Sequence, residues 1–292
     1  MLSYMITGIV EQFKDLYESK LFDLTLATGV AAYFGAWGAQ KLAEREKRRE
    51  EIVREIRNTN AAIAISMALF NQFVSMKRQH VKRLYQDYLR HRAEFDKAME
   101  KPRSERPVTT FAIDMQTLSL EWGPVDILQD KIFSQISAVG RPLNLAAIIS
   151  VEFHALANAL NTRNAIIESN KAKNVAHLPL EYYFGLPDAH GNVNQDWPSL
   201  INAIHLHTDC GVFFTQLLCK DLMEHGQQFV TQLKKRYGCH PNRVSKVDFS
   251  TVEAGLIPGE DEFRDWIDNF KKHKEEGFLE CFKTWLTTLR VV

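Results

Sequence analysis

The sequence predicts a mainly α protein in which an N-terminal transmembrane helix continues into a long helix and a cytosolic helical bundle. Two observations support this. Leu21–Ala39 is the stretch that is apolar enough and long enough to cross a bilayer, which takes about 20 residues. Apolar residues then recur at helical spacing through most of the chain, without Pro or Gly between Glu44 and Ala98. The predicted parts are residues 1–20, 21–40, 41–100 and 108–292.

The ends of the apolar stretch indicate how it would lie in a membrane. Tyr33, Phe34 and Trp37 gather near its C-terminal end, as an interfacial aromatic belt does. Lys41 and Arg45 open a basic segment directly after it, which by the positive-inside rule places the N-terminus outside and the body in the cytoplasm. No basic region precedes the stretch, so an uncleaved signal anchor is favoured over a signal peptide. The alternative is a buried helix of a soluble protein.

Small residues recur every four positions within the predicted anchor. They are Ala27, Ala31, Gly35 and Ala39. Such a strip lets a second helix approach closely, so it predicts homo-oligomerisation in the bilayer. The alternative is an anchor that is Ala-rich for no further reason. Before the anchor, residues 1–20 have the pattern of an amphipathic helix that lies on a membrane surface or packs on copies of itself.

Residues 41–100 are predicted to form one long, coiled-coil-like helix with a break or bend. Its apolar positions approximate a heptad: Val53, Ile56, Ile63, Met67, Phe70, Val74, Val81, Leu84, Tyr88 and Phe95. Polar residues interrupt this pattern at Asn60, Lys77 and His91. The apolar ribbon widens at Ala61–Phe70, which indicates packing against other helices there.

The remaining body is predicted from its spacing and its breaks. Lys101–Val108 contains two prolines and is expected to be a linker, and Val108–Leu120 alternates as an extended segment would. Further helices are expected over the ranges Asp126–Ser137, Leu143–Ser169, Pro198–Tyr237 and Asp261–Leu289.

Two groups of residues could bind a macromolecular partner. Arg78, Lys82 and Arg83 belong to a basic stretch, and acidic residues interleave with its continuation. A solvated helix face is therefore favoured over a nucleic-acid surface, and nucleic acid is an unlikely partner. Trp266 and Trp285 lie on an aromatic C-terminal face that would be core or a docking surface for a protein.

His205, Asp209 and Cys210 are the weak candidates for metal ligands. His205 and Asp209 share a helix face, but the spacing supplies no ligands from a second element, so no metal site is predicted. No catalytic motif and no cofactor are predicted, and the catalytic residues stay unknown. The formal charge is zero, with 36 basic and 36 acidic residues, which argues against a polyelectrolyte partner.

Three segments together resemble a group of bacterial single-pass membrane proteins with a helical cytosolic domain. They are the ranges Asn71–His80, Phe111–Leu120 and Val151–Asn164, which follow a small-residue anchor and an Arg/Glu-rich helix. The resemblance implies a location in the bacterial inner membrane and carries over no catalytic residue.

These features favour a non-enzymatic, membrane-anchored and oligomeric assembly protein or effector, including a pore-forming or membrane-perturbing role in stress or phage defence. One alternative is a membrane-tethered adaptor that binds a protein or nucleic-acid partner. Another is a cryptic metal-dependent hydrolase that uses His205, Asp209 and Cys210.

Overall fold

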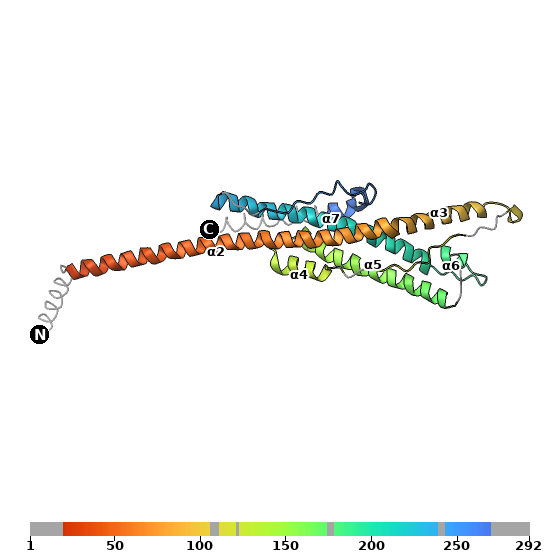
Figure 1. The fold of residues 1–292 in the computed structure, drawn as a ribbon, viewed down its shortest axis with the longest axis horizontal. Helices are drawn as coiled ribbons and strands as arrows, with labels where there is room; N and C mark the ends of the chain where they lie inside the picture. Colours follow the sequence, from red (N-terminus) through yellow and green to blue (C-terminus); the bar gives the residue numbers. More distant parts are fainter. Residues whose placement is uncertain (1–19, 106–110, 121–122, 174–177, 239–242, 270–292) are drawn as a thin grey trace, which may run out of the picture. The chain divides into compact units, whose positions relative to one another are not determined.

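The computed structural model describes residues 20–105, 111–120, 123–173, 178–238 and 243–269, with side chains from Thr28 onward (Figure 1). These residues are mainly helical, as predicted, and contain no β-strand beyond an isolated bridge between Pro187 and Val193. The elements are α2 (Lys20–Met76), the π-helix η1 (Lys77–Val81), α3 (Lys82–Met99), the 3-10 helix η2 (Arg103–Glu105), α4 (Val125–Gln135), α5 (Arg141–Ala172), α6 (Leu180–Phe184), α7 (Asp196–Tyr237) and the 3-10 helix η3 (Glu260–Phe263). The predicted amphipathic segment 1–20 lies outside the described residues, apart from Lys20.

The described chain divides into two compact units. The first unit contains Met1–Arg54 and Gln232–Pro241, and the second contains Glu55–Thr231 and Asn242–Val292. Two of the three boundaries fall within helices, after Arg54 in α2 and after Thr231 in α7.

The range 41–99, where one long helix with a break is predicted, is helical throughout, and a π-helix interrupts the α-helix there. Helices α2, η1 and α3 follow one another without a turn, and η1 begins at Lys77, one of the predicted polar interruptions. All ten predicted heptad positions are buried or half-buried, with Ile56, Ile63 and Phe70 at most 2% exposed. Lys77 and Val81, the first and last residues of η1, are both buried.

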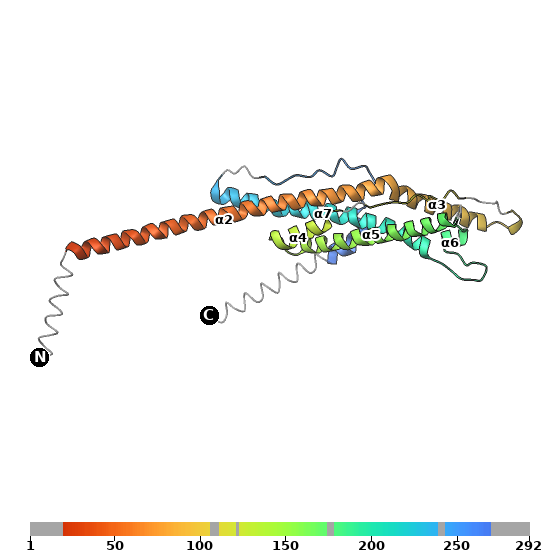
Figure 2. The same cartoon turned by 60° about the horizontal axis from the view of Figure 1, so that its bottom comes forward.

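Helices of the second unit pack around one hydrophobic core. Figures 1 and 2 both show α4 beside α5. Polar contacts join α7 to three other elements: Lys77 to Asp209, His207 to Glu152, Arg141 to Asp221, and Glu55 to His225. The ring of Phe73 packs on α7 at Gly211, where an added Cβ would lie 2.3 Å from a ring carbon. Glycine is required there because any side chain would displace Phe73.

Residues 111–120 form an extended segment. Side chains of α5 form hydrogen bonds with the backbone of this segment. Arg163, which is fully buried, donates hydrogen bonds of 2.8 Å to the carbonyls of Asp114 and Gln116. Asn164 pairs with both the N–H and the carbonyl of Leu118, at 3.0 and 2.6 Å. These side chains replace a neighbouring strand as the hydrogen-bond partner, so a segment with a strand-like pattern needs no sheet.

One helix within the described residues is long and apolar enough to cross a membrane, and it is α5 rather than the predicted anchor. In its most apolar window, 39% of the residues are buried in the protein, and Arg163 lies in the same helix at full burial. The stretch Leu21–Ala39 is less apolar because Asp23 and several Ala, Gly and Thr residues fill it. Its backbone is helical, as predicted, throughout this range.

The C-terminal part is described up to residue 269. Residues 247–259 are irregular, and η3 leads into helical residues 264–269, within the range where a helix is predicted. The rest of the predicted helix Asp261–Leu289, including Trp285, lies outside the described residues.

Candidate functional site

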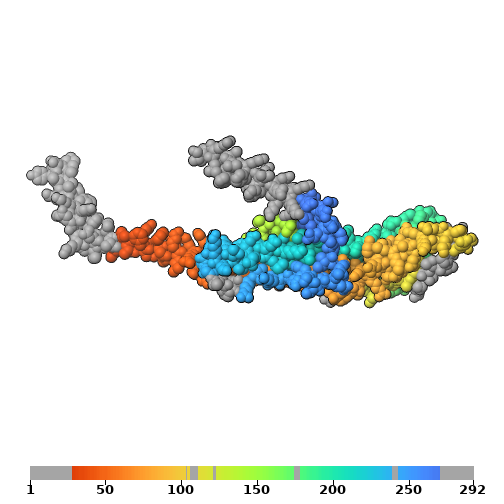
Figure 3. All heavy atoms as spheres, turned by 90° about the horizontal axis from the view of Figure 1, so that it is seen from above, coloured from red at the N-terminus to blue at the C-terminus, as the bar shows by residue number. Residues whose placement is uncertain are grey.

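The start of α2 in the first unit exposes a large amount of apolar surface. Every described side chain from Thr28 to Ala43 is exposed, including Tyr33 at 68%, Phe34 at 61% and Trp37 at 52%. Single exposed apolar residues are common in soluble proteins, but contiguous groups of large ones mark sites of contact with protein or lipid. Figure 3 shows this part of α2, in orange, beside the blue end of α7.

The exposed aromatic side chains belong to a stripe that continues into cations. Val30, Phe34 and Trp37 stand at i, i+4 and i+7, so they share one face of the helix. The same spacing of four and three residues leads on to Lys41, Arg45 and Arg48. An apolar, aromatic face therefore changes into a cationic face within one turn.

The predicted small-residue strip is open to its surroundings. Ala31, Gly35 and Ala39 are exposed, and a Cβ added at Gly35 would meet no atom within 4 Å. The side chain of Ala27 lies outside the described residues. Among the described residues, none comes close enough to require a small residue at Gly35, so this strip is available for lipid or for a second helix.

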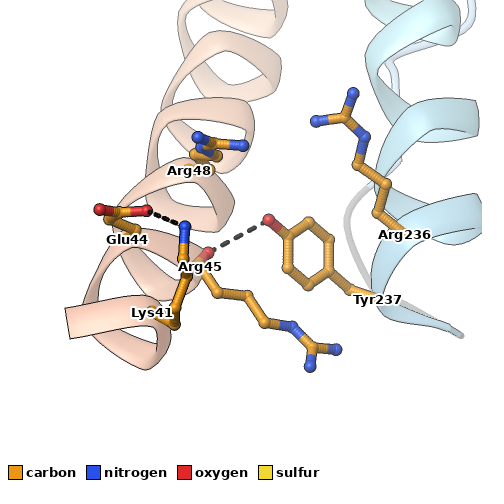
Figure 4. Close-up of a pocket in the computed structure, with 6 residues that line it drawn as sticks. All are labelled: Lys41, Glu44, Arg45, Arg48, Arg236 and Tyr237. Carbon is orange, nitrogen blue, oxygen red and sulfur yellow. Dashed lines mark hydrogen bonds and ion pairs between the residues drawn. The ribbon is translucent and has the colours of Figure 1, made fainter. Parts of the chain in front are cut away.

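A cationic groove lies between α2 and the end of α7 within the first unit. We call it the cationic groove; its volume is about 340 Å³. The residues that line it are Lys41, Glu44, Arg45, Arg48, Arg236 and Tyr237 (Figure 4). Lys41 and Arg45 were predicted to lie at the membrane interface, whereas the contribution of α7 was not predicted.

Tyr237 joins the two sides of the cationic groove. Its hydroxyl donates a 3.1 Å hydrogen bond to the backbone carbonyl of Arg45. The guanidinium carbon of Arg45 lies 5.6 Å from the centre of the same ring, within the range of a cation–π contact. In Figure 4 the side chains of Arg48 and Arg236 extend into the gap from opposite helices. Tyr237 thus fixes the floor of the groove while two arginines remain above it.

The charges in the cationic groove do not balance. Four cations and one carboxylate line it, a formal excess of three positive charges. Glu44 lies 3.5 Å from Lys41, and its pKa is below the usual value because Gln40 donates a hydrogen bond to it and Lys41 is close. Within the described part of the chain, no carboxylate forms an ion pair with Arg45, Arg48 or Arg236.

The predicted partner-binding residues on η1 and α3 have acidic neighbours. Lys82 lies 3.7 Å from Glu253, and Arg83 lies 3.5 Å from Asp87. Arg78 is exposed. Two of the three cations are therefore partly neutralised at the surface, as the interpretation of a solvated helix face expects.

The predicted metal candidates have other partners. The ammonium of Lys77 lies 2.8 Å from Asp209 in a buried charge contact, and His205 stacks on Tyr85 with ring centres 3.8 Å apart. Burial lowers the pKa of His205 and raises the pKa of the Cys210 thiol to about 12. A lysine bound to the carboxylate and a protonated thiol are both unsuited to metal ligation. Among the described residues, no group of three His, Cys, Asp or Glu could hold a metal.

Trp266 uses part of its surface inside the second unit. Its ring is half-buried and lies 5.0 Å from Phe214, while Phe263 stacks on Phe213 at 4.0 Å. This part of the predicted aromatic face therefore contributes to packing, and its role in binding a partner stays a prediction.

The signal that could have revealed the cationic groove is present in the sequence. Lys234, Lys235 and Arg236 form the last turn of α7, just before Gly238. Cations are favoured at helix C-termini, so this cluster has an ordinary explanation, and only the fold places Arg236 opposite Arg48.

In comparisons with known proteins, no family model, no curated protein and no solved structure matches the chain.

Proposed function

We propose that this chain is a membrane-anchored, oligomeric and non-enzymatic assembly protein or effector. In this proposal the start of α2 is a single transmembrane helix with its N-terminus outside the bacterial inner membrane, and the second unit is a cytoplasmic helical bundle. The observation that carries the proposal is the exposed apolar run Thr28–Ala39, which the other described residues leave uncovered.

A bilayer is the environment that suits this surface best. Leaving Tyr33, Phe34 and Trp37 in water forgoes most of the free energy that burial of an aromatic side chain supplies, about 1.5–3 kcal/mol for a side chain of Phe size. Tyr and Trp prefer the membrane interface, where the ring is apolar and the polar atom reaches water. The cations that begin at Lys41 match the cytoplasmic side of such an interface.

A non-enzymatic role is supported by the way the body uses its polar side chains. Asp209 is bound by Lys77, Glu152 by His207, and Asp221 by Arg141. The thiols of Cys210 and Cys219 have pKa values raised to about 12 by burial, so neither is a ready nucleophile. These groups connect helices rather than face a substrate.

Alkaline carbonate extraction of the full chain tests the anchor. The wild-type chain is expected to remain in the membrane pellet and to dissolve only in detergent. Val30→Arg places a charge in the apolar run. Inserting a charged residue near the centre of a membrane helix costs about 2.5–3.5 kcal/mol, so the variant is expected to shift toward the supernatant. Lys47→Arg, which keeps the charge of an exposed position, serves as the control. Release of the wild-type chain by carbonate would contradict the anchor.

Oligomerisation through the small-residue strip has its own test. Gly35→Leu adds bulk to the strip, and Gly29→Leu adds the same bulk on a different face. A Cβ at either position would have no described atom within 4 Å. We expect the wild-type chain and Gly29→Leu to be oligomeric in mild detergent and Gly35→Leu to dissociate, as measured by light scattering. A monomeric wild-type chain would refute this part of the proposal.

A further inference from the structure

We infer that the cationic groove binds the phosphate group of an anionic phospholipid headgroup. This inference rests on the proposed function, because it takes the start of α2 to lie in a bilayer. It adds to the anchor a specific site, built from both α2 and α7, that recognises the charge of the lipid surface.

The first argument is electrostatic. Lys41 and Arg45 stand at i and i+4 on α2, and Arg48 follows three residues later, so like charges face one another along one side of the helix. Such pairs destabilise a helix unless a counter-charge is present. Arg236 adds a fourth cation from α7, and Glu44 is the one carboxylate that lines the groove. An anion bound there would relieve this repulsion.

The second argument is the chemistry of the donors. Arg48 and Arg236 reach into the groove from two helices, and each guanidinium carries a planar fork of N–H donors. One such fork binds two oxygens of a phosphate or a carboxylate, and two forks together suit the several oxygens of a single phosphate group. The volume of about 340 Å³ is within the range of small-molecule sites. Tyr237 holds the floor rigid through its contacts with Arg45.

The third argument is the position of the groove along α2. Lys41 lies one turn after Trp37, about 6 Å along the helix, and Arg45 lies about 12 Å after it. The headgroup layer of a bilayer is about 5–8 Å thick on each side. With Trp37 at the interface, Lys41 falls in this layer and Arg45 lies just past it. Arg48 lies about 17 Å after Trp37, so its long side chain must extend back toward the membrane to reach a lipid phosphate. A lipid phosphate is therefore the nearest abundant anion.

Native mass spectrometry of the full chain tests the inference. The chain is released from micelles that contain equal amounts of phosphatidylglycerol and phosphatidylcholine, and the retained lipid is identified. The wild-type chain is expected to retain phosphatidylglycerol preferentially. The double variant Arg48→Gln/Arg236→Gln is expected to lose about 30-fold in affinity, the effect of removing two cations near an anionic surface.

A charge-matched variant distinguishes the groove from general basicity. Lys47→Gln/Lys234→Gln removes two exposed cations from the same two helices, and neither residue lines the groove. It is expected to retain phosphatidylglycerol within about threefold of the wild-type chain, because the two lysines point to solvent, where salt screens their charges, and do not contact a lipid in the groove. Equal losses in both double variants, or no preference for phosphatidylglycerol in the wild-type chain, would overturn the inference.

A competition experiment distinguishes a lipid site from a site for free phosphate. Comparison with the carbonate extraction distinguishes failure of the groove from failure of the anchor. Inorganic phosphate is added as the competitor; displacement of the lipid at equal concentrations would overturn the lipid as the source and indicate a site for soluble phosphate. If the chain resists carbonate extraction but shows no dependence on Arg48 and Arg236, the anchor stands and the groove fails. If carbonate releases the chain, the anchor fails, whatever the groove binds.

Discussion

The two halves of α2 lie in different environments although they form one helix. From Thr28 to Ala43 every side chain is exposed, including the large apolar side chains of Tyr33, Phe34 and Trp37. In the second unit, Ile56, Ile63 and Phe70 on the same helix are at most 2% exposed. The difference shows that helical register persists through the boundary between units, while the environment depends on what covers each face. In the second unit, other helices bury the apolar face of α2. The first part of α2 has no such neighbour among the described residues.

The buried ion pair of the body is expected to be the most sensitive point of the second unit. Asp209→Ala leaves the ammonium of Lys77 buried without its partner, which costs about 3–5 kcal/mol of unfolding free energy. Urea unfolding followed by circular dichroism measures this loss. Asp96→Ala removes an exposed partner of Arg92 and is expected to cost at most about 1 kcal/mol. Equal effects of the two substitutions would show that the Lys77 contact is not buried in solution.

A pair of identical glycine substitutions compares the two regions directly. Gly211→Ala forces a Cβ against Phe73 and is expected to cost about 1–3 kcal/mol. Gly35→Ala meets no atom within the chain, so the gain in helix propensity is expected to leave stability unchanged or higher, by up to about 1 kcal/mol. Thermal unfolding of both variants measures the difference. A loss of stability in Gly35→Ala would indicate a close contact at the strip.

Periodicity was sufficient to predict the long helices, because their apolar residues carry a repeat that is local in the sequence. The apolar positions from Val53 to Phe95 lie in helix and are buried or half-buried, and helices are found close to Leu143–Ser169 and Pro198–Tyr237. Lys77 was recognised as an interruption, but its partner Asp209 could not be predicted, since only the packing of η1 on α7 brings them together. The same reason applies to Arg163, whose carbonyl partners lie in the extended segment.

The candidate site was predicted only in part. Lys41 and Arg45 were identified from the charges that follow the apolar stretch. Arg48, Arg236 and Tyr237 were not, because half of the groove comes from the far end of α7. Local patterns identify a face of one helix, whereas a groove between two helices depends on which of them lie side by side.

Protonation of buried histidines is expected to weaken the body at low pH. Burial lowers the pKa of His205 and His91 below the ordinary value of 6.5. Between each lowered value and 6.5 the unfolded chain binds more protons than the folded chain, so stability is fully present above 6.5 and falls as the pH falls. The urea midpoint should therefore be lower at pH 5 than at pH 7, and His205→Gln should reduce this difference. An unchanged dependence in that variant would exclude His205 as a source.

The central claim, that the start of α2 lies in lipid, is tested most directly by the environment of Trp37. The full chain and its Trp37→Phe variant are reconstituted in vesicles with and without brominated phospholipid, and the difference between their emission spectra isolates Trp37. The account predicts that bromine near the headgroup end of the acyl chains quenches this difference signal more strongly than aqueous iodide does. Quenching by iodide with no effect of bromine would place Trp37 in water and contradict the account.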